Sequence, residues 1–276
     1  MNTEFSVKDA VTRRYSVRTY EKTSLEPQLV RKLVDYANSL ENPFGVKIRV
    51  QTVEKETAAN GEKLGTYGVI KGAKLYLGVT VPDKPHAMEA VGYDFEKLVL
   101  YAASLGLGTC WLGGTFNRSA FAEAMEIKEA ELFPILSPLG LPSDKKSLTE
   151  KLMRKTVKAD QRLPWQQLFF TEGFEKPLTD GDGGSYAFPL EMVRLAPSAV
   201  NKQPWRISVE EGAVHFYRKG IPAEGSIDMQ RIDLGIALCH FDLAARESGL
   251  AGHIEISPPD IAMPEGLEYI ASWRRD

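Results

Sequence analysis

The chain has 276 residues, and a hydrophobic share of 43% is enough to bury a core in one large domain or two smaller ones. Its net charge of -3 and its pI near 5.9 disfavour nucleic acid or an anionic membrane surface as the main partner. The polar N-terminus and the lack of a long apolar run predict a cytoplasmic protein without a signal peptide or membrane span.

The sulfur and imidazole side chains predict neither a disulfide nor a metal site. Cys110 and Cys239 lie far apart, each within an apolar stretch, so we expect buried, reduced thiols. The four histidines lack the spacing of metal ligands. They are His86, His215, His240 and His253.

A basic segment follows a short helix predicted at the start of the chain. Polar and apolar residues alternate over 13–20, which is typical of extended backbone, so Arg14, Ser16 and Arg18 should point to one side. Two guanidinium groups flanking a hydroxyl suit a phosphate, because the arginine fork matches phosphate oxygens. A solvated basic edge strand is the alternative interpretation.

The rest of the first half predicts alternating helices and buried strands. We expect helices at 25–40, 87–105 and 117–125, and strands at 46–53, 73–81, 109–112 and 133–141. Residues 54–68 are polar and predict a loop or a short helix. The strand at 109–112 ends at Gly113 and Gly114, where bare backbone either approaches a ligand closely or makes a turn.

Residues 143–162 are strongly basic, which predicts a solvated charged helix that could also supply local positive charge. Residues 164–184 are the expected connector between two halves. Their aspartate-glycine run lacks the further carboxylates of a calcium loop.

The polar loop at 197–203 follows a helix predicted at 188–195, which Pro197 must end. Ser198, Asn201 and Gln203 can offer fixed donors and acceptors to a flat heteroaromatic ligand. In the alternative, these side chains cap their own backbone in an Asx-type turn.

The second half repeats features of the first, in the same order. Ala37, Ser39 and Asn42 align with Ala196, Ser198 and Asn201. Further on, five identities align Gly92, Leu100, Ala102, Gly106 and Leu107 with Gly235, Leu243, Ala245, Gly249 and Leu250. This pattern predicts an internal duplication and a pseudo-two-fold arrangement within one chain.

Together, the segments 13–20, 106–114 and 196–205 resemble the nitroreductase family of flavin enzymes, in particular its fused two-copy branch. The resemblance implies an α+β nitroreductase-like fold, in which two tandem copies form an intramolecular pseudo-dimer of mostly antiparallel sheets flanked by helices. It further implies a first half at 1–163, which anchors the phosphate, and a shorter second half at 164–276, which supplies the polar loop.

In that family, FMN lies at a dimer interface. Carried over by position, the resemblance implies that Arg14, Ser16 and Arg18 hold the phosphate, together with Lys158 or Arg162. The backbone at Gly113 and Gly114 would face the flavin ring. The second half would complete the site with Pro197, Ser198, Ala199 and Asn201.

Two departures from the family pattern imply that only one site survives. Where the second copy should carry a phosphate segment, residues 168–175 contain no arginine and include Glu172 and Glu175. The first copy keeps Asn42 but has Asn38 in place of the loop proline.

The implied function is an FMN-dependent oxidoreductase that takes a hydride from NADH or NADPH and reduces a nitroaromatic, a quinone or a similar acceptor. The flavin supplies the chemistry, so no protein acid or base is assigned. A dehalogenase-like or flavin-degrading relative is one alternative, and a flavin-binding or interaction protein without turnover is another. We expect a monomer that acts as a pseudo-dimer.

Overall fold

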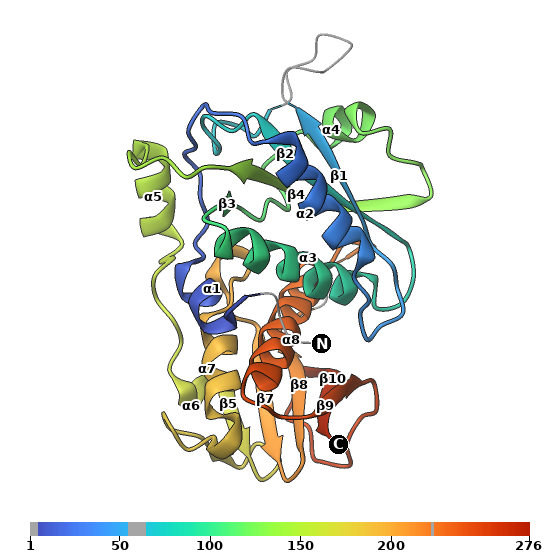
Figure 1. Ribbon diagram of the computed structural model, residues 1–276. Helices are drawn as coiled ribbons and strands as arrows, with labels where there is room; N and C mark the ends of the chain where they lie inside the picture. Colours follow the sequence, from blue (N-terminus) through green and yellow to red (C-terminus); the bar gives the residue numbers. More distant parts are fainter. Residues whose placement is uncertain (1–4, 55–64, 222–223) are drawn as a thin grey trace.

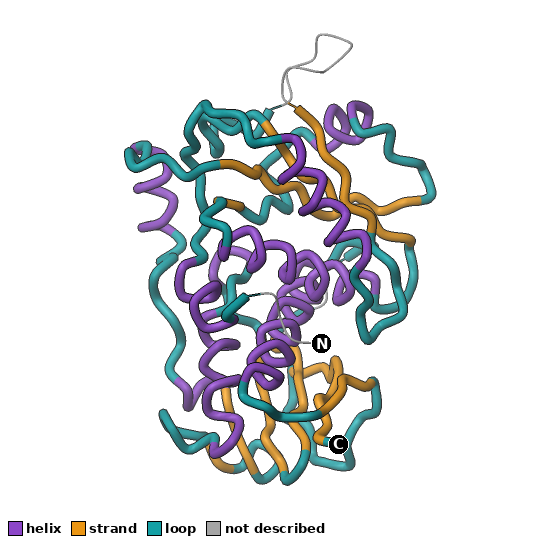
Figure 2. The backbone as a smooth tube through the Cα atoms, in the orientation of Figure 1, coloured by secondary structure: helices purple, strands orange, loops and turns teal. Residues whose placement is uncertain are grey.

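The computed structural model describes residues 5–54, 65–221 and 224–276. Two β-sheets lie at opposite ends of the molecule, and long helices pack between them (Figures 1 and 2). The stretch expected to be a loop or short helix at 54–68 falls largely outside these residues. Within the described ranges, no helix combines the length and apolar character needed to cross a bilayer.

The first sheet comes from residues 49–140 and has the strand order β1-β2-β4-β3, with antiparallel pairing throughout. The central strand β2 is buried along most of its length, as its apolar sequence predicts. Val79 lies opposite Ile135 in the register of β2 and β4. The bounds are β1 (Arg49–Glu54), β2 (Leu75–Pro82), β3 (Gly108–Thr109) and β4 (Glu131–Gly140).

The second sheet comes from residues 169–275 and has the order β6-β5-β7-β8-β10-β9. Only the β5 and β7 pair is parallel among its described strands. Gly212 adopts a φ of 73° in the tight turn between β7 and β8, a conformation that favours glycine. The bounds are β5 (Phe169–Thr171), β6 (Lys176–Pro177), β7 (Trp205–Glu210), β8 (Ala213–Lys219), β9 (Gly252–Glu255) and β10 (Leu267–Arg275).

Two long helices, α3 (Ala87–Ser104) and α8 (Met229–Glu247), pack against each other between the sheets (Figure 1). A Cβ atom at Gly92 would lie 2.1 Å from the carbonyl oxygen of Ile232, and one at Gly235 would lie 2.1 Å from that of Glu89. The close approach is therefore reciprocal. It involves the two glycines that the sequence repeat aligns, and only glycine allows the backbones to come this near.

Three of the shorter helices begin where side chains satisfy free backbone N–H groups. Ser6, Asn117 and Ser147 each accept a hydrogen bond from the first turn of the following helix. The bounds are α1 (Val7–Arg13), α2 (Pro27–Ser39), α4 (Arg118–Ala124), α5 (Leu148–Thr156), α6 (Trp165–Leu168) and α7 (Ala187–Leu195). Two short 3₁₀ turns are η1 (Gly184–Tyr186) and η2 (Ala199–Asn201).

One hydrophobic core runs through both halves. It includes Val91 of α3, Ile236 of α8 and Phe216 of β8, all nearly inaccessible to solvent. A smaller cluster around Phe121 and Phe133 fills the space beneath the first sheet. The predicted α+β class, with mostly antiparallel sheets flanked by helices, is confirmed.

The strand predicted at 109–112 was wrong beyond its first residue. β3 ends at Thr109, because the Cys110 N–H donates to the Ser137 hydroxyl (3.1 Å) instead of to a backbone carbonyl. Leu112 then forms only an isolated bridge with Leu136. Arg13 ends α1, and residues 14–20 are extended as predicted. Among the described strands this segment joins no sheet; isolated bridges, such as that between Ser16 and Thr109, and hydrogen bonds of the Thr19 side chain tie it to its neighbours.

Candidate functional site

A cavity of about 710 Å³ lies between elements of the two halves. Its walls come from the end of α1, the segment after β3, the chain around α5, the loop after α7 and the start of α8. All the predicted binding residues except Lys158 line it. They are Arg14, Ser16, Arg18, Gly113, Gly114, Arg162, Pro197, Ser198, Ala199 and Asn201.

Arg14 and Arg18 stand on the α1 side of the cavity. Arg14 follows the last residue of α1, its side chain is 7% exposed, and its Nε makes no hydrogen bond in the structure. The two terminal nitrogens of Arg14 also have no hydrogen-bond partner among the described residues. Burial lowers the pKa of Arg14, because desolvation disfavours its charged form. An anion in the cavity would relieve that cost.

Arg162 already has several partners. Its Nη1 donates to the carbonyl oxygens of Ala159 and Gln161 (2.9 Å each) and to Asn201 Oδ1 (3.4 Å), and its Nη2 donates to the Leu195 carbonyl (3.3 Å). Burial, followed by repulsion from Arg14, lowers the pKa of Arg162 to about 10. The residue therefore joins the chain after α5 to the loop after α7, besides adding positive charge to the cavity.

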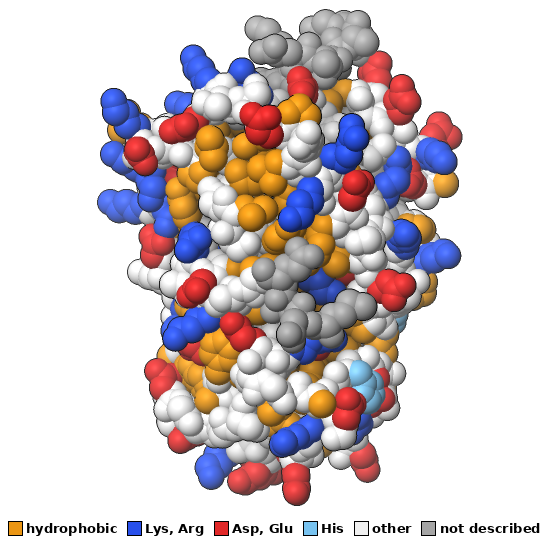
Figure 3. Space-filling model, in the orientation of Figure 1, with side chains coloured by type: hydrophobic (Ala, Val, Ile, Leu, Met, Phe, Trp, Pro, Cys, Tyr) orange, Lys and Arg blue, Asp and Glu red, His pale blue; other side chains and the backbone are white. Residues whose placement is uncertain are grey.

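Lys158 does not line the cavity. Its carbonyl oxygen accepts a hydrogen bond from Asn201 Nδ2 (2.8 Å), so its backbone supports the loop after α7. Figure 3 shows lysine and arginine side chains crowding the edge of the molecule at α5. The basic helix predicted within 143–162 exists, as α5, and is largely solvated.

Gly113 and Gly114 bring bare backbone to the cavity. Arg118 holds the Gly113 carbonyl through a hydrogen bond from Nη2 (2.6 Å). Among the described residues, the N–H groups of Gly113 and Gly114 make no backbone hydrogen bond. A Cβ atom at Gly113 would lie 2.6 Å from Met229 Cε, whereas one at Gly114 would meet open space. A side chain at Gly113 would therefore have to displace the flexible end of Met229, whereas at Gly114 glycine keeps the cavity open.

The loop at 197–203 is held by its own polar side chains. Ser198 Oγ accepts from the Gln203 N–H (2.9 Å), and Gln203 Oε1 accepts from the Leu163 N–H (2.8 Å). Asn201 Nδ2 donates to the carbonyls of Lys158 and Gln161 (2.8 and 2.9 Å). Ser198 therefore forms the local turn that was the alternative interpretation, while Asn201 bridges to a distant segment.

Two cavity residues on α8 were missed by sequence reasoning. Met229 packs against Gly113, and Asp233 accepts a hydrogen bond from the Ala199 N–H (2.9 Å) through Oδ1. Asp233 is 2% exposed, and its Oδ2 has no partner in the structure. Burial raises the pKa of Asp233 well above its ordinary value. The available signal was an acid between Ile232 and Leu234, at the start of the apolar stretch of α8.

Glu96 of α3 contacts residues from both halves of the chain, next to Arg14. This fully buried carboxylate accepts a hydrogen bond from Trp111 Nε1 (2.9 Å), its Oε1 shares a hydrogen bond with His240 Nε2 (2.9 Å), and it lies 3.9 Å from Arg14 Nε. The other ring nitrogen of His240 bonds to the Met192 carbonyl (2.8 Å). Four elements thus meet at one carboxylate.

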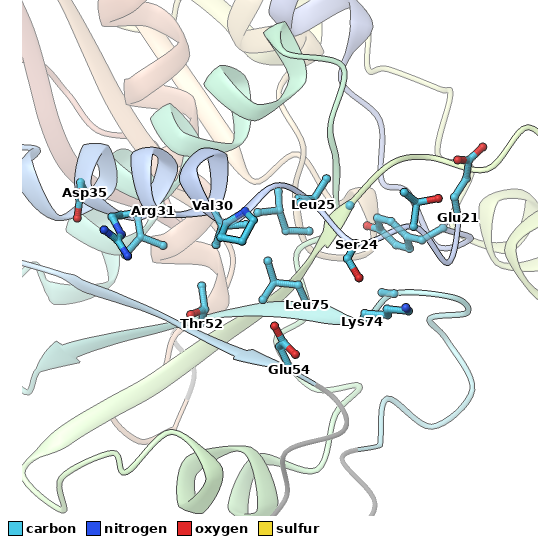
Figure 4. A pocket seen from close by; sticks show the side chains of 17 residues that line it. Glu21, Ser24, Leu25, Val30, Arg31, Asp35, Thr52, Glu54, Lys74 and Leu75 are labelled. Atoms are coloured by element: carbon cyan, nitrogen blue, oxygen red, sulfur yellow. The ribbon is translucent and has the colours of Figure 1, made fainter.

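A second cavity, of about 440 Å³, lies between α2 and the first sheet (Figure 4). Its interior is apolar, with Leu25, Val30 and Leu75, and charged side chains such as Arg31 and Glu54 stand around it. Its lining comes from the first half alone.

The larger cavity, of about 710 Å³, is called the seam cavity below, because residues from both halves of the chain line it. It has the size of a small-molecule site and gathers arginines, glycine amides and a polar loop, a combination suited to an anionic ligand with a polar ring. The sequence matches the model of the family described as "Putative TM nitroreductase" over residues 6–245, and the chain belongs to this family. No curated protein matches the sequence.

Two solved structures are similar to this chain to different degrees. One, described as a "putative nitroreductase" from Thermotoga maritima MSB8, is 19% identical, with a TM-score of 0.61 over 100% of this chain and 93% of that one. A nitroreductase with bound FMN from Desulfitobacterium hafniense DCB-2 is also 19% identical, with a TM-score of 0.42 over 53% of this chain and 92% of that one.

Proposed function

We propose that the seam cavity binds FMN and that the protein is an FMN-dependent oxidoreductase. It would take reducing equivalents from NADH or NADPH and pass them to a nitroaromatic, a quinone or a similar acceptor. The observation that carries the proposal is the convergence of the Arg14 segment and the Pro197 loop, from opposite halves, on one cavity. Membership of a nitroreductase family supports the same chemistry.

The α1 side of the cavity fits a phosphate. Arg14 offers terminal nitrogens without partners among the described residues, and Arg18 has a buried Nε without one. Arginine binds phosphate through paired, charge-assisted hydrogen bonds, which are stronger than neutral ones. Arg14, Ser16 and Arg18 would hold the phosphate, with Arg162 adding charge from behind.

The glycine side of the cavity fits the edge of a polar ring. The N–H groups of Gly113 and Gly114 can donate to ring oxygen and nitrogen atoms, because the bare backbone allows close approach. The cavity volume of about 710 Å³ lies inside the range of roughly 300–1,000 Å³ that is usual for such ligands.

When bound, FMN supplies the hydride chemistry. The residues of this chain bind and orient it: arginines fix one end, glycine amides fix the ring edge, and the loop at 197–201 covers the site from the second half. Burial of the Arg14 side chain keeps water away from its charge and strengthens its interactions. We assign no residue of the chain as a proton donor or acceptor in the reaction.

The proposal includes an ancient duplication, with halves at 1–163 and 164–276 that act as a pseudo-dimer within a monomeric, cytoplasmic protein. The reciprocal contact of Gly92 and Gly235 supports it, since the aligned glycines occupy equivalent places on α3 and α8. In a symmetric dimer the same site would occur twice. Here the second copy lacks arginine at 168–175, so one site is expected.

Spectroscopy of the purified protein tests the proposal. Protein loaded with FMN should be yellow, lose its absorbance on anaerobic addition of NADH or NADPH, and regain it when a quinone or nitroaromatic is added. A protein that takes up no FMN contradicts the proposal. A protein that binds FMN but is never reduced by either nucleotide contradicts its catalytic part and favours a binding protein.

A further inference from the structure

Glu96 is the carboxylate that faces Arg14 within salt-bridge distance in the described structure. Its Oε1 lies 3.9 Å from Arg14 Nε, and neither side chain is more than 7% exposed. The contact is with the Nε edge of the guanidinium, and the two terminal nitrogens have no partner in the described residues. Arg14 can therefore meet two anions at once, one on each side.

Two other arginines lie near Arg14. Arg154 and Arg162 lie close enough to repel it, while Glu96 is the strongest influence that favours its charged form. Arg154 in turn is paired with Asp160, and Arg162 is satisfied mainly by carbonyl oxygens. Without Glu96, Arg14 would be a buried cation with no carboxylate within salt-bridge distance among the described residues, which is costly.

The position of Glu96 does not depend on Arg14. Trp111 Nε1 donates to one of its oxygen atoms, and the other is hydrogen-bonded to His240 Nε2. Phe95 and Trp111 pack edge to face beside it, with ring centroids 4.9 Å apart. The carboxylate would therefore stay in place when a ligand binds, and its negative charge would then act on that ligand.

We propose that Glu96 is the internal counter-ion of the phosphate site. It stabilises Arg14 while the cavity holds no anion, and it weakens the binding of the FMN phosphate by repulsion once the anion is present. This inference rests on the proposed FMN site. Its consequence is selective, because a ligand of the same shape without the phosphate has no charge for Glu96 to repel.

The test compares FMN with riboflavin, which lacks the phosphate. Dissociation constants for both are measured by fluorescence quenching in the full-length protein and in Glu96→Gln, which keeps the shape but removes the charge. The ratio of the riboflavin constant to the FMN constant should rise about ten-fold in Glu96→Gln, since one charge at close range acts on the phosphate. An unchanged or lower ratio overturns the inference.

Two further variants make the result specific. Asp94→Asn changes another buried acid on α3, which Asn42 holds (2.6 Å) and which does not line the cavity, so the ratio should stay constant. In an Arg14→Gln background, Glu96→Gln should change the ratio less than in the wild-type background, since the cation that brings the two anions together is gone.

If Glu96→Gln does not fold, Glu96→Asp serves instead, because it keeps the charge but withdraws it from Arg14. The ratio should then rise by less than ten-fold, and a fall contradicts the inference. Failure of the proposed function looks different, because neither FMN nor riboflavin would bind the wild-type protein. If FMN and riboflavin both bind, and the ratio of their dissociation constants is the same in the wild-type protein and in the variants of Glu96, only this inference fails.

Discussion

The two cavities described above differ in the residues that line them. The seam cavity draws on both halves and contains buried polar groups without partners, such as Arg14 Nε and Asp233 Oδ2. The cavity in Figure 4 belongs to the first half, and its lining includes no buried unpartnered polar atom among those that the structure describes.

This contrast shows why the seam is the better candidate for a binding site. A buried donor or acceptor without a partner costs free energy, and it persists where a ligand completes it. The apolar interior beneath α2 needs no such completion, since its charged side chains reach solvent. The size and shape of the two cavities alone would not have shown which one is the better candidate for a binding site.

The largest expected effect comes from removing Arg14. Arg14→Ala deletes the charged donors of the phosphate wall, so FMN affinity should fall about 100-fold, because charge-assisted hydrogen bonds are the strong ones. Arg31→Ala, at the other cavity, is the matched control and should bind FMN normally. Titration by flavin fluorescence measures both, and equal effects would remove the distinction between the cavities.

The helix contact behind the seam should be sensitive to one added methyl group. In Gly235→Ala, a Cβ atom would lie 2.1 Å from the Glu89 carbonyl oxygen, so α3 and α8 must move apart, at a cost of about 1–3 kcal/mol. Urea unfolding measures this loss. Gly114→Ala is the control, since its Cβ atom meets open space, and a similar loss there would contradict the interpretation.

The two aligned asparagines allow a comparison of the halves. Asn201→Ala frees two carbonyls at 158–161 and loosens the loop over the cavity, so FMN affinity should fall about ten-fold, along with stability. Asn42→Ala loses similar bonds, to Val46 and Asp94, away from the cavity. It should reduce stability alone, as thermal unfolding with and without FMN would reveal; a matching loss of FMN affinity would contradict the assignment.

The smallest effect concerns Asp233 and pH. Its raised pKa means that the folded protein keeps a proton that the unfolded chain releases above the ordinary pKa of 3.8, so stability falls as pH rises from there. Asp233→Asn removes this penalty, and its stability relative to wild type should increase from pH 4 towards neutrality. A constant difference across that range would show that the group ionises normally.

Much of the fold could be predicted from local patterns. The apolar runs around Val79 and Ile135, the glycine stop at Gly106 and the proline after α7 set the element types, and the repeat located Gly92 and Gly235. The end of β3 could not be predicted, because it depends on a hydroxyl 27 positions away, that of Ser137. Such a partner has no signature in the strand itself.

Part of the site could be predicted from the sequence, because some of its residues form a short local motif. Arg14, Ser16 and Arg18 reach the cavity, but Arg13 and Tyr15 line it too, so the alternation of extended backbone does not by itself account for the lining. Glu96 and Asp233 escaped prediction, since each sits in a helix whose face is set by packing between the halves. The double role of Asn201 also stayed hidden, because its partners at 158–161 are distant in sequence.

The central claim is that both halves build one flavin site at the seam. Equilibrium dialysis of the purified protein against FMN tests it most directly. We predict one FMN for each chain, with most of this binding lost in Arg14→Ala. Two FMN molecules for each chain, none at all, or one that is indifferent to Arg14→Ala would contradict the account.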